Sequence, residues 1–225
     1  MKKYNFNEKE LFDLFVNKDD AAMPITTLKP YRRDGCVYGT DGKKLIRVKD
    51  SVISGEYEAT DKMALKWPEN NCDYSITDND IREVLSKIPQ EEEIKTVGHD
   101  IKCPECDGEG TVWWEYKDKK FETHEAEHDC PICDGSGYIK KAKKRKTGWM
   151  IPSPIQIIKV GKNNILSCHL QTLLDAMNII RVSEVGLVCQ TKVFNHFKID
   201  DNISIMFISN SLAADYEMPL SGYKD

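Results

Sequence analysis

The chain has 225 residues, of which 40% are hydrophobic, and a formal net charge of −5 at pH 7. Its length allows one sizeable domain or two small ones, and its acidity argues against indiscriminate attraction to DNA or to an anionic membrane, while leaving room for a local basic patch. No apolar run approaches the roughly 18 residues that span a bilayer. The opening MKKYNFNEKELFDLF lacks the apolar core of a secretory signal. A cytoplasmic protein without membrane contact is expected.

The first region predicts a strand, a helix and two further strands. KKYNF alternates like a short strand, and Asn7 is a helix N-cap with Glu10 at the third helical position, as in a capping box. The helix would bury one face, made of Leu11, Phe12, Phe15 and Val16. The stretch CVYGTDGKKLIRVK then predicts two strands joined at Asp41-Gly42, a strong hairpin signal.

Two later regions repeat this order. CDYSI is a candidate strand, Thr77 with Asp80 caps the helix DNDIREVLSKI, Pro89 ends that helix, and EEIKTV and HDIKC are candidate strands. After Ile151 come the strands IQIIKV and NNILSCHL, the helix QTLLDAMNII, and the strands EVGLVCQ, KVFNHFKID and NISIMFIS. The unit strand–helix–three strands therefore recurs near residues 3–60, 72–102 and 155–210, which predicts an α+β fold.

Eight cysteines fall into two groups. Four are scattered through apolar or alternating stretches, where reduced, buried thiols behave as small hydrophobes: Cys36, Cys72, Cys168 and Cys189. The other four lie in two matching phrases, CPECDGEG and CPICDGSG. Each C-x-x-C lets two thiolates grip one ion, and two such knuckles supply the closed tetrahedral set of a structural zinc site. One zinc ion is therefore predicted, with the ligands Cys103, Cys106, Cys130 and Cys133.

Three other interpretations of the cysteines stay open. A redox dithiol needs only one C-x-x-C at the start of a helix, which leaves the duplication unexplained. An iron–sulfur cluster also uses four thiolates. His124 and His128 lie between the knuckles and could replace a thiolate, although solvated histidines are the simpler interpretation.

The two phrases resemble the C-x-x-C-x-G-x-G repeats of the DnaJ-type cysteine-rich zinc finger. That family carries four repeats and two zinc ions, so residues 103–137 correspond to half of the module with one ion. The resemblance implies hairpin-like knuckles around the metal. The chain lacks the His-Pro-Asp signature of a J-domain, so stimulation of an Hsp70-type ATPase is not implied.

The stretch TVWWEYKDKKFETHEAEHD between the knuckles predicts a β-hairpin arm. Val112, Trp114 and Tyr116 would share one side of its first strand, with Trp113 on the other. Trp113 and Trp114 would either cover the small metal core or form an exposed contact with a protein or a nucleic-acid base.

A basic run follows the second knuckle directly. Its cations could contact phosphates and make binding salt-sensitive. The predicted nucleic-acid contacts are Lys140, Lys141, Lys143, Lys144, Arg145 and Lys146. A solvated connector, or a counterpart to the acidic hairpin, would explain the same residues.

The remaining sequence resembles the bacterial DNA sliding clamp, the polymerase III beta subunit. VYGTDGKKLIRV is similar to its T-D-G hairpin, YSITDNDIREVLSKIPQEEEIKTV to a strand–helix–strand segment, and LQTLLDAMNIIRVSEVGLVCQ to the last helix and strand of its third domain. This implies clamp-like β-α-β-β-β repeats at residues 1–102 and 149–215, an inserted zinc-binding arm at 103–148 and a flexible tail at 216–225. A generic α+β sheet domain is the alternative. A ring would require several copies of so short a chain, hence a homo-oligomer.

No catalytic motif is present: the sequence has no Walker-type loop, no G-x-S-x-G and no H-E-x-x-H. The leading hypothesis is a non-catalytic zinc protein with a clamp-like scaffold that acts in DNA binding, replication or repair. The main alternative is a chaperone-like or adaptor module whose zinc hairpin binds protein without nucleic acid. A third is a redox switch that releases zinc when its thiols are oxidised.

Overall fold

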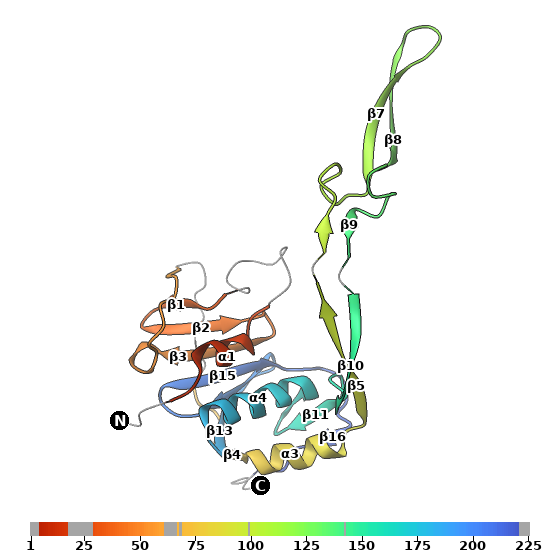
Figure 1. Cartoon of the computed structure of the whole chain (residues 1–225). Helices are drawn as coiled ribbons and strands as arrows, with labels where there is room; N and C mark the ends of the chain where they lie inside the picture. Colours follow the sequence, from red (N-terminus) through yellow and green to blue (C-terminus); the bar gives the residue numbers. More distant parts are fainter. Residues whose placement is uncertain are drawn as a thin grey trace. The chain divides into compact units, whose positions relative to one another are not determined.

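A computed structural model describes residues 5–17, 29–60, 67, 69–98, 100–141 and 143–220 (Figure 1). The chain divides into two compact units, one formed by residues 1–91 and 151–225 and the other by residues 92–150. We call the second unit the arm. The arm begins earlier than the insertion predicted at residues 103–148. Strands that precede residue 103 pair with strands that follow the second cysteine phrase, and so belong to the same unit. None of the helices in the described ranges is long and apolar enough to cross a membrane.

The first unit is built around a seven-stranded antiparallel sheet in the order β1-β2-β3-β15-β14-β13-β4. Its strands are β1 (Tyr31–Arg33), β2 (Cys36–Thr40), β3 (Lys44–Lys49), β15 (Ile203–Ile208), β14 (Phe194–Lys198), β13 (Glu184–Gln190) and β4 (Tyr74–Thr77). The β3–β15 pairing joins the two ends of the chain, with Ile46 opposite Ile205. The predicted hairpin turn is confirmed, since the Asp41 carboxylate accepts the N–H groups of Lys43 and Lys44 and Gly42 has a φ of 88°.

Among the described residues, three α-helices belong to this unit: α1 (Glu8–Asp13), α3 (Asp78–Lys87) and α4 (Ser167–Ile180). Both predicted caps are confirmed. The Asn7 side chain accepts the N–H of Glu10 at 3.2 Å, and Thr77 and Asp80 form a reciprocal capping box. A short 3-10 turn, η1 (Asp50–Val52), follows β3.

A second sheet has three strands in the order β12-β11-β16: β12 (Asn163–Leu166), β11 (Ile157–Val160) and β16 (Tyr216–Glu217). β16 runs parallel to β11, with Tyr216 opposite Ile158, and Met218 is only 3% exposed. The predicted flexible tail at residues 216–225 is therefore wrong for its first residues, which belong to this sheet and to the core. Residues 221–225 lie outside the described part of the chain.

One apolar core lies between the helices and the sheets and receives side chains from α1, α3 and α4. α4 buries nine of its fourteen residues and is the central helix. Strand residues alternate between this core and a smaller cluster on the other face of the large sheet, as period-two pleating requires. In β2, β3 and β15, the larger core takes Val37, Ile46 and Ile205, and the smaller cluster takes Tyr38, Leu45 and Met206.

Two local predictions differ from the structure. Ser167–Leu170 were assigned to a strand with Asn163, but β12 ends at Leu166 and these residues form the first turn of α4. The buried positions Leu170, Leu173, Leu174 and Met177 recur at helical spacing, so packing of this face outweighs the apolar run. The strand predicted at residues 2–6 falls mostly outside the described residues, and Asn5 and Phe6 lie in no helix or strand.

Within its described residues, the arm contains three two-stranded ribbons in succession. They pair β5 (Gln90–Val97) with β10 (Lys143–Pro152), β6 (Ile101–Lys102) with β9 (Tyr138–Lys140), and β7 (Thr111–Lys117) with β8 (Thr123–Asp129). The cysteine phrases occupy the two loops between the β6–β9 ribbon and the β7–β8 ribbon. The described part of the chain is mostly β, with few helices.

Glu8 ties α1 to the segment after η1. Its carboxylate accepts hydrogen bonds from the Ser54 N–H (2.6 Å) and hydroxyl (2.8 Å), the Gly55 N–H (3.0 Å) and the Tyr57 hydroxyl (3.0 Å). Burial acts to raise the pKa of Glu8, but these donors outweigh it and hold the pKa below its ordinary value.

Glu8→Gln should lower the free energy of unfolding by about 1–3 kcal/mol at pH 7, because it removes a charged acceptor from four donors. A depressed folded-state pKa stabilises the protein above the ordinary Glu pKa of about 4.3, and this is lost as the pH falls through the folded-state value. Urea denaturation along a pH series should therefore show the difference shrinking on acidification. Glu10→Gln, exposed on the same helix, is the control. Equal effects of the two variants at pH 7 would contradict this role.

Candidate metal centre

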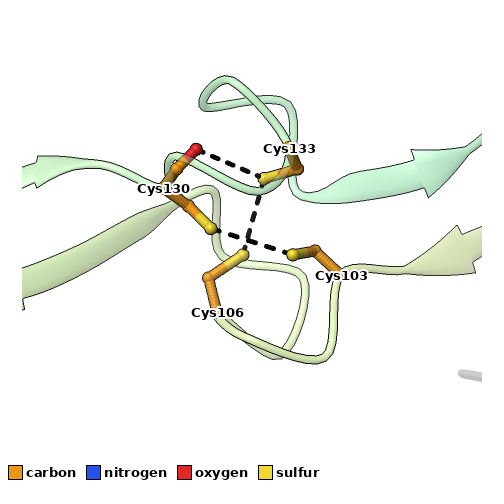
Figure 2. A group of neighbouring side chains, drawn as sticks. All are labelled: Cys103, Cys106, Cys130 and Cys133. Atoms are coloured by element: carbon orange, nitrogen blue, oxygen red, sulfur yellow. Dashed lines mark hydrogen bonds between the residues drawn. The ribbon is translucent and has the colours of Figure 1, made fainter.

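Two loops of the same length place the four cysteines. The first contains Cys103 and Cys106 and leads into β7, and the second contains Cys130 and Cys133 and follows β8. All four thiols are buried and none forms a disulfide. Each loop joins the β6–β9 ribbon to the β7–β8 ribbon. The two C-x-x-C phrases therefore face each other (Figure 2).

The sulfur geometry fits a single tetrahedral ion. The Sγ atoms of Cys103 and Cys130 lie 3.8 Å apart, as do those of Cys106 and Cys133, and all four sulfurs lie within 4.8 Å of one another. A tetrahedron with zinc–sulfur bonds of about 2.3 Å has edges of about 3.8 Å. In a four-iron cluster each thiolate would bind a different iron and the sulfurs would be spread further apart. The sulfur spacing therefore fits a single tetrahedral ion better than a four-iron cluster.

The backbone of each loop supports the other in a nearly symmetrical way. The N–H of Cys103 donates to the carbonyl of Gly137 (2.9 Å), and the N–H of Cys130 donates to the carbonyl of Gly110 (2.8 Å). Within each loop, the N–H of Gly110 points at Cys106 Sγ and that of Gly137 at Cys133 Sγ, both at 3.3 Å. Such N–H···S contacts stabilise thiolates and orient metal ligands.

The last glycine of each phrase is required by a close approach of the loops. A Cβ on Gly110 would lie 2.4 Å from the carbonyl oxygen of Gly135, and a Cβ on Gly137 would lie 2.3 Å from that of Gly108. Both glycines also have a φ in the left-handed region, 86° and 74°. The repeated C-x-x-C-x-G-x-G pattern thus encodes both the sulfurs and the contact between their loops.

The thiols differ in acidity. Burial acts to raise the pKa of Cys106, but N–H groups of Gly110 and Gly108 and the neighbouring thiols lower it to about 7. Burial raises the pKa of Cys130 to about 11, against N–H groups of its own loop. A bound cation favours the thiolate form of every ligand, so uptake of a metal ion would release protons from thiols that are protonated in its absence.

The structure contradicts the alternative interpretation in which a histidine replaces one of the thiolate ligands. His124 lies 3.4 Å from the Asp118 carboxylate and stacks on Tyr116, and His128 packs against Trp114. Neither imidazole belongs to the group formed by the four sulfurs. Asp118, with Glu122 and His124, forms a second group at the hairpin turn, but its carboxylate already accepts two N–H groups of that turn.

The tryptophans do not cover the sulfurs. Val112 is the apolar side chain that packs on the cysteine cluster, whereas Trp113 and Trp114 are 69% and 52% exposed. The interpretation in which they shield the metal core is therefore wrong, and their role in partner binding stays a prediction.

The predicted phosphate contacts lie on β9, on β10 and in the short link between these strands. Each of the six cationic side chains is exposed. Lys146 is held by Glu92 at 2.7 Å, while Lys140, Lys141, Lys143, Lys144 and Arg145 form no ion pair with any described residue. The basic run is thus only partly neutralised by acidic neighbours.

Two of the four remaining cysteines are buried as predicted, and the other two are only partly buried. Cys36 and Cys189 are buried, Cys72 and Cys168 are partly buried, and all are free. Burial raises the pKa of Cys72 to about 11, so this thiol stays protonated and unreactive at neutral pH.

No known protein family matches the sequence, and no curated protein sequence matches it significantly. Similar solved structures include DNA polymerase III β clamps. That of Borrelia burgdorferi is 9% identical with a TM-score of 0.40, covering 95% of this chain and 65% of its own. That of Pseudomonas aeruginosa is 10% identical with a TM-score of 0.38, covering 89% and 62%. The Helicobacter pylori clamp bound to a DNA ligase peptide is 13% identical with a TM-score of 0.39, covering 91% and 62%. This chain spans less than two thirds of the length of these clamps, and both the sequence identity and the structural similarity are low.

Cys130→Ser with Cys133→Ser should abolish binding of one equivalent of zinc, because two thiolates cannot close a tetrahedral site. Metal analysis of the purified chain after dialysis against a weak chelator measures the stoichiometry. Cys168→Ser, which removes a thiol outside the centre, should keep the full equivalent. A double variant that retained one equivalent would eliminate this ligand set.

Gly110→Ala should weaken zinc binding about tenfold or more, since the added methyl forces the two loops apart. Gly98→Ala is the matched control. Gly98 also has a left-handed φ, 87°, but a Cβ there would meet nothing within 4 Å. Competition with a chromogenic chelator gives both affinities. Similar losses in the two variants would show that backbone strain, and not the approach of the loops, is responsible.

Proposed function

We propose that this chain is a non-catalytic zinc protein in which one ion, held by Cys103, Cys106, Cys130 and Cys133, fixes a β-ribbon arm that contacts DNA through its basic run. The observation that carries the zinc assignment is the near-tetrahedral spacing of the four sulfurs. Four thiolates leave no open coordination position for water or substrate, which supports a structural and not a catalytic role for the metal.

The DNA assignment rests on the chemistry of the basic run. Five of its six cations are exposed and free of ion pairs with the described residues, and they lie within seven consecutive positions. On β10, side chains alternate, so Lys144 lies on one face of the ribbon and Lys143 and Arg145 on the other. Both faces therefore offer cations to phosphates. Lys146 should contribute less because Glu92 already binds it.

The helices of the first unit are a poorer DNA surface. α1 carries three acidic residues and one basic residue, and α3 carries three acidic and two basic residues. α4 carries one acidic residue and no lysine or arginine. A duplex approaching these helices would meet net negative charge. The proposed contact therefore lies on the arm, and the sequence resemblance to sliding clamps supports a proposed role in DNA replication or repair.

A protein-binding adaptor is the second candidate function. One observation favours it: Trp113 is 69% exposed on a ribbon that carries more acidic than basic residues. Exposed tryptophan is enriched at sites of protein recognition, and net negative charge opposes nucleic acid there.

Lys143→Gln, Lys144→Gln and Arg145→Gln together should weaken DNA binding at about 50 mM salt by tenfold or more. The slope of log affinity against log salt should become shallower by roughly 2–3, because each phosphate contact contributes about 0.9. Fluorescence anisotropy with labelled duplex and single-stranded DNA over a salt series measures both quantities.

The matched control is Lys117→Gln, Lys119→Gln and Lys120→Gln, which changes the charge equally near the hairpin turn of the same arm. It should change DNA affinity less than threefold. Absence of wild-type binding at low salt, or equal losses in the two triple variants, would refute contact by the basic run.

A further inference from the structure

We propose that one face of the β7–β8 ribbon, which we call the acidic face, binds a lysine- or arginine-rich segment of a partner polypeptide. The acidic face consists of Trp113, Glu115, Glu125 and Glu127. This inference requires the arm to be folded but is independent of the proposed contact between the basic run and DNA.

The register of the ribbon brings these four side chains together. Trp113 pairs with Glu127, and Glu115 pairs with Glu125. Residues that are paired, or that lie two apart along a strand, point to the same face, so the indole has a carboxylate directly across the ribbon and others in the neighbouring positions. All four side chains are exposed.

On the opposite face of the same ribbon, the aromatic side chains contact other rings of the ribbon. Trp114 packs against His128 with ring centroids 5.0 Å apart, and Tyr116 stacks on His124 at 5.4 Å. Trp113, in contrast, stacks on no other ring within the continuous described stretch 100–141. The two adjacent tryptophans therefore differ: Trp114 is part of a cross-strand aromatic pair, and Trp113 is presented to solvent.

The charges of the acidic face are unbalanced. Glu115 and Glu125 are directly opposite each other, and like charges in that position destabilise a ribbon. None of the three glutamates forms an ion pair with a described residue. Lys117, at the end of the same face, pairs across the strands with Thr123 and also forms no ion pair there. A cationic group bound from outside would relieve this repulsion.

The combination of an indole with carboxylates selects an organic cation. An ammonium or guanidinium group is attracted to the face of a tryptophan ring and forms charge-assisted hydrogen bonds with carboxylates. A divalent metal ion would use the carboxylates but not the indole. Nucleic acid would stack on the indole, but its phosphates would be repelled by the glutamates. A basic polypeptide segment is the ligand that uses all four side chains.

The test uses the full-length, zinc-loaded chain and fluorescein-labelled hexalysine and hexaarginine peptides, with a neutral Gly-Ser peptide as a blank. Anisotropy titrations should show saturable binding of both basic peptides. Trp113→Ala should lower the affinity at least fivefold, and Glu115→Gln, Glu125→Gln and Glu127→Gln together at least tenfold. Zinc content and circular dichroism confirm that each variant is folded.

Two matched controls separate the acidic face from general acidity of the chain. Trp114→Ala, and the triple variant Glu105→Gln, Glu109→Gln and Glu122→Gln, which makes the same charge change on the same arm, should each alter peptide affinity less than twofold. If either control loses as much affinity as its counterpart, or if Trp113→Ala has no effect, the proposal is overturned.

Two further outcomes would assign the acidic face to another ligand. Displacement of the peptide by Mg²⁺ at concentrations where the same ionic strength of NaCl has no effect would identify a metal site. Self-association of the chain that is abolished both by the acidic-face triple variant and by neutralising Lys143, Lys144 and Arg145 would identify a second copy as the occupant. DNA binding should be retained by the acidic-face variants, so failure of this proposal is distinguishable from failure of the DNA assignment.

Discussion

The arm depends on the contact between two loops that approach until the backbone of each touches the other. Its ribbons have two strands each, and isolated two-stranded ribbons are at best marginally stable. The buried apolar cluster of the arm consists of the four cysteines with Val112 packed against them, whereas the first unit has a continuous core drawn from three helices and two sheets. A metal ion at the four sulfurs would therefore take the place of a hydrophobic core, as in other small units that cannot bury enough apolar surface. The glycines of the two phrases are therefore as necessary for the site as the cysteines. Without Gly110 and Gly137 the loops could not approach, and the sulfurs would not reach tetrahedral spacing.

The sequence predicted the features that short-range patterns encode. The cysteine phrases, the caps at Asn7 and Thr77 and the Asp41-Gly42 turn each lie within eight residues, and the structure has all of them. The start of α4 was missed because NNILSCHL is apolar enough for a strand, and the helical spacing of Leu170 with Leu173 and Leu174 matters only once the core is known. β16 was missed because a pair of residues joining a strand some sixty positions earlier leaves no local signal. The β3–β15 pairing, between segments more than 150 residues apart, was invisible for the same reason.

The acidic face shows a further limit of sequence patterns. The alternation in TVWWEYK and THEAEHD was visible, and it placed Trp113 and Trp114 on opposite sides. Which glutamates surround Trp113 depends on the hairpin register, and a slip of one residue would move every side chain of one strand to the other face. In the structure the Asp118 carboxylate accepts the N–H groups of Lys120 and Glu122, which sets the turn and with it the pairing of Glu115 with Glu125. A carboxylate that forms no part of the acidic face thus determines which residues make it.

The basic run and the acidic face lie on different ribbons of the arm, with the cysteine loops between them. The free cations of the basic run lie on β9, β10 and their link, and the glutamates of the acidic face lie on β7 and β8, so the two surfaces would attract ligands of opposite sign. A uniformly charged ligand such as DNA would be held at one surface and repelled from the other, which limits how far it can extend along the arm. β7, β8 and β9 each adjoin a cysteine loop, and β10 follows β9 after a two-residue link, so the separation and the relative twist of the two surfaces would depend on the same four sulfurs. If the arm orders only when the ion is bound, a ligand that prefers the ordered arm must raise the affinity for zinc by the same factor by which zinc raises the affinity for that ligand. The two oppositely charged surfaces would then be linked through the metal, although no residue belongs to both.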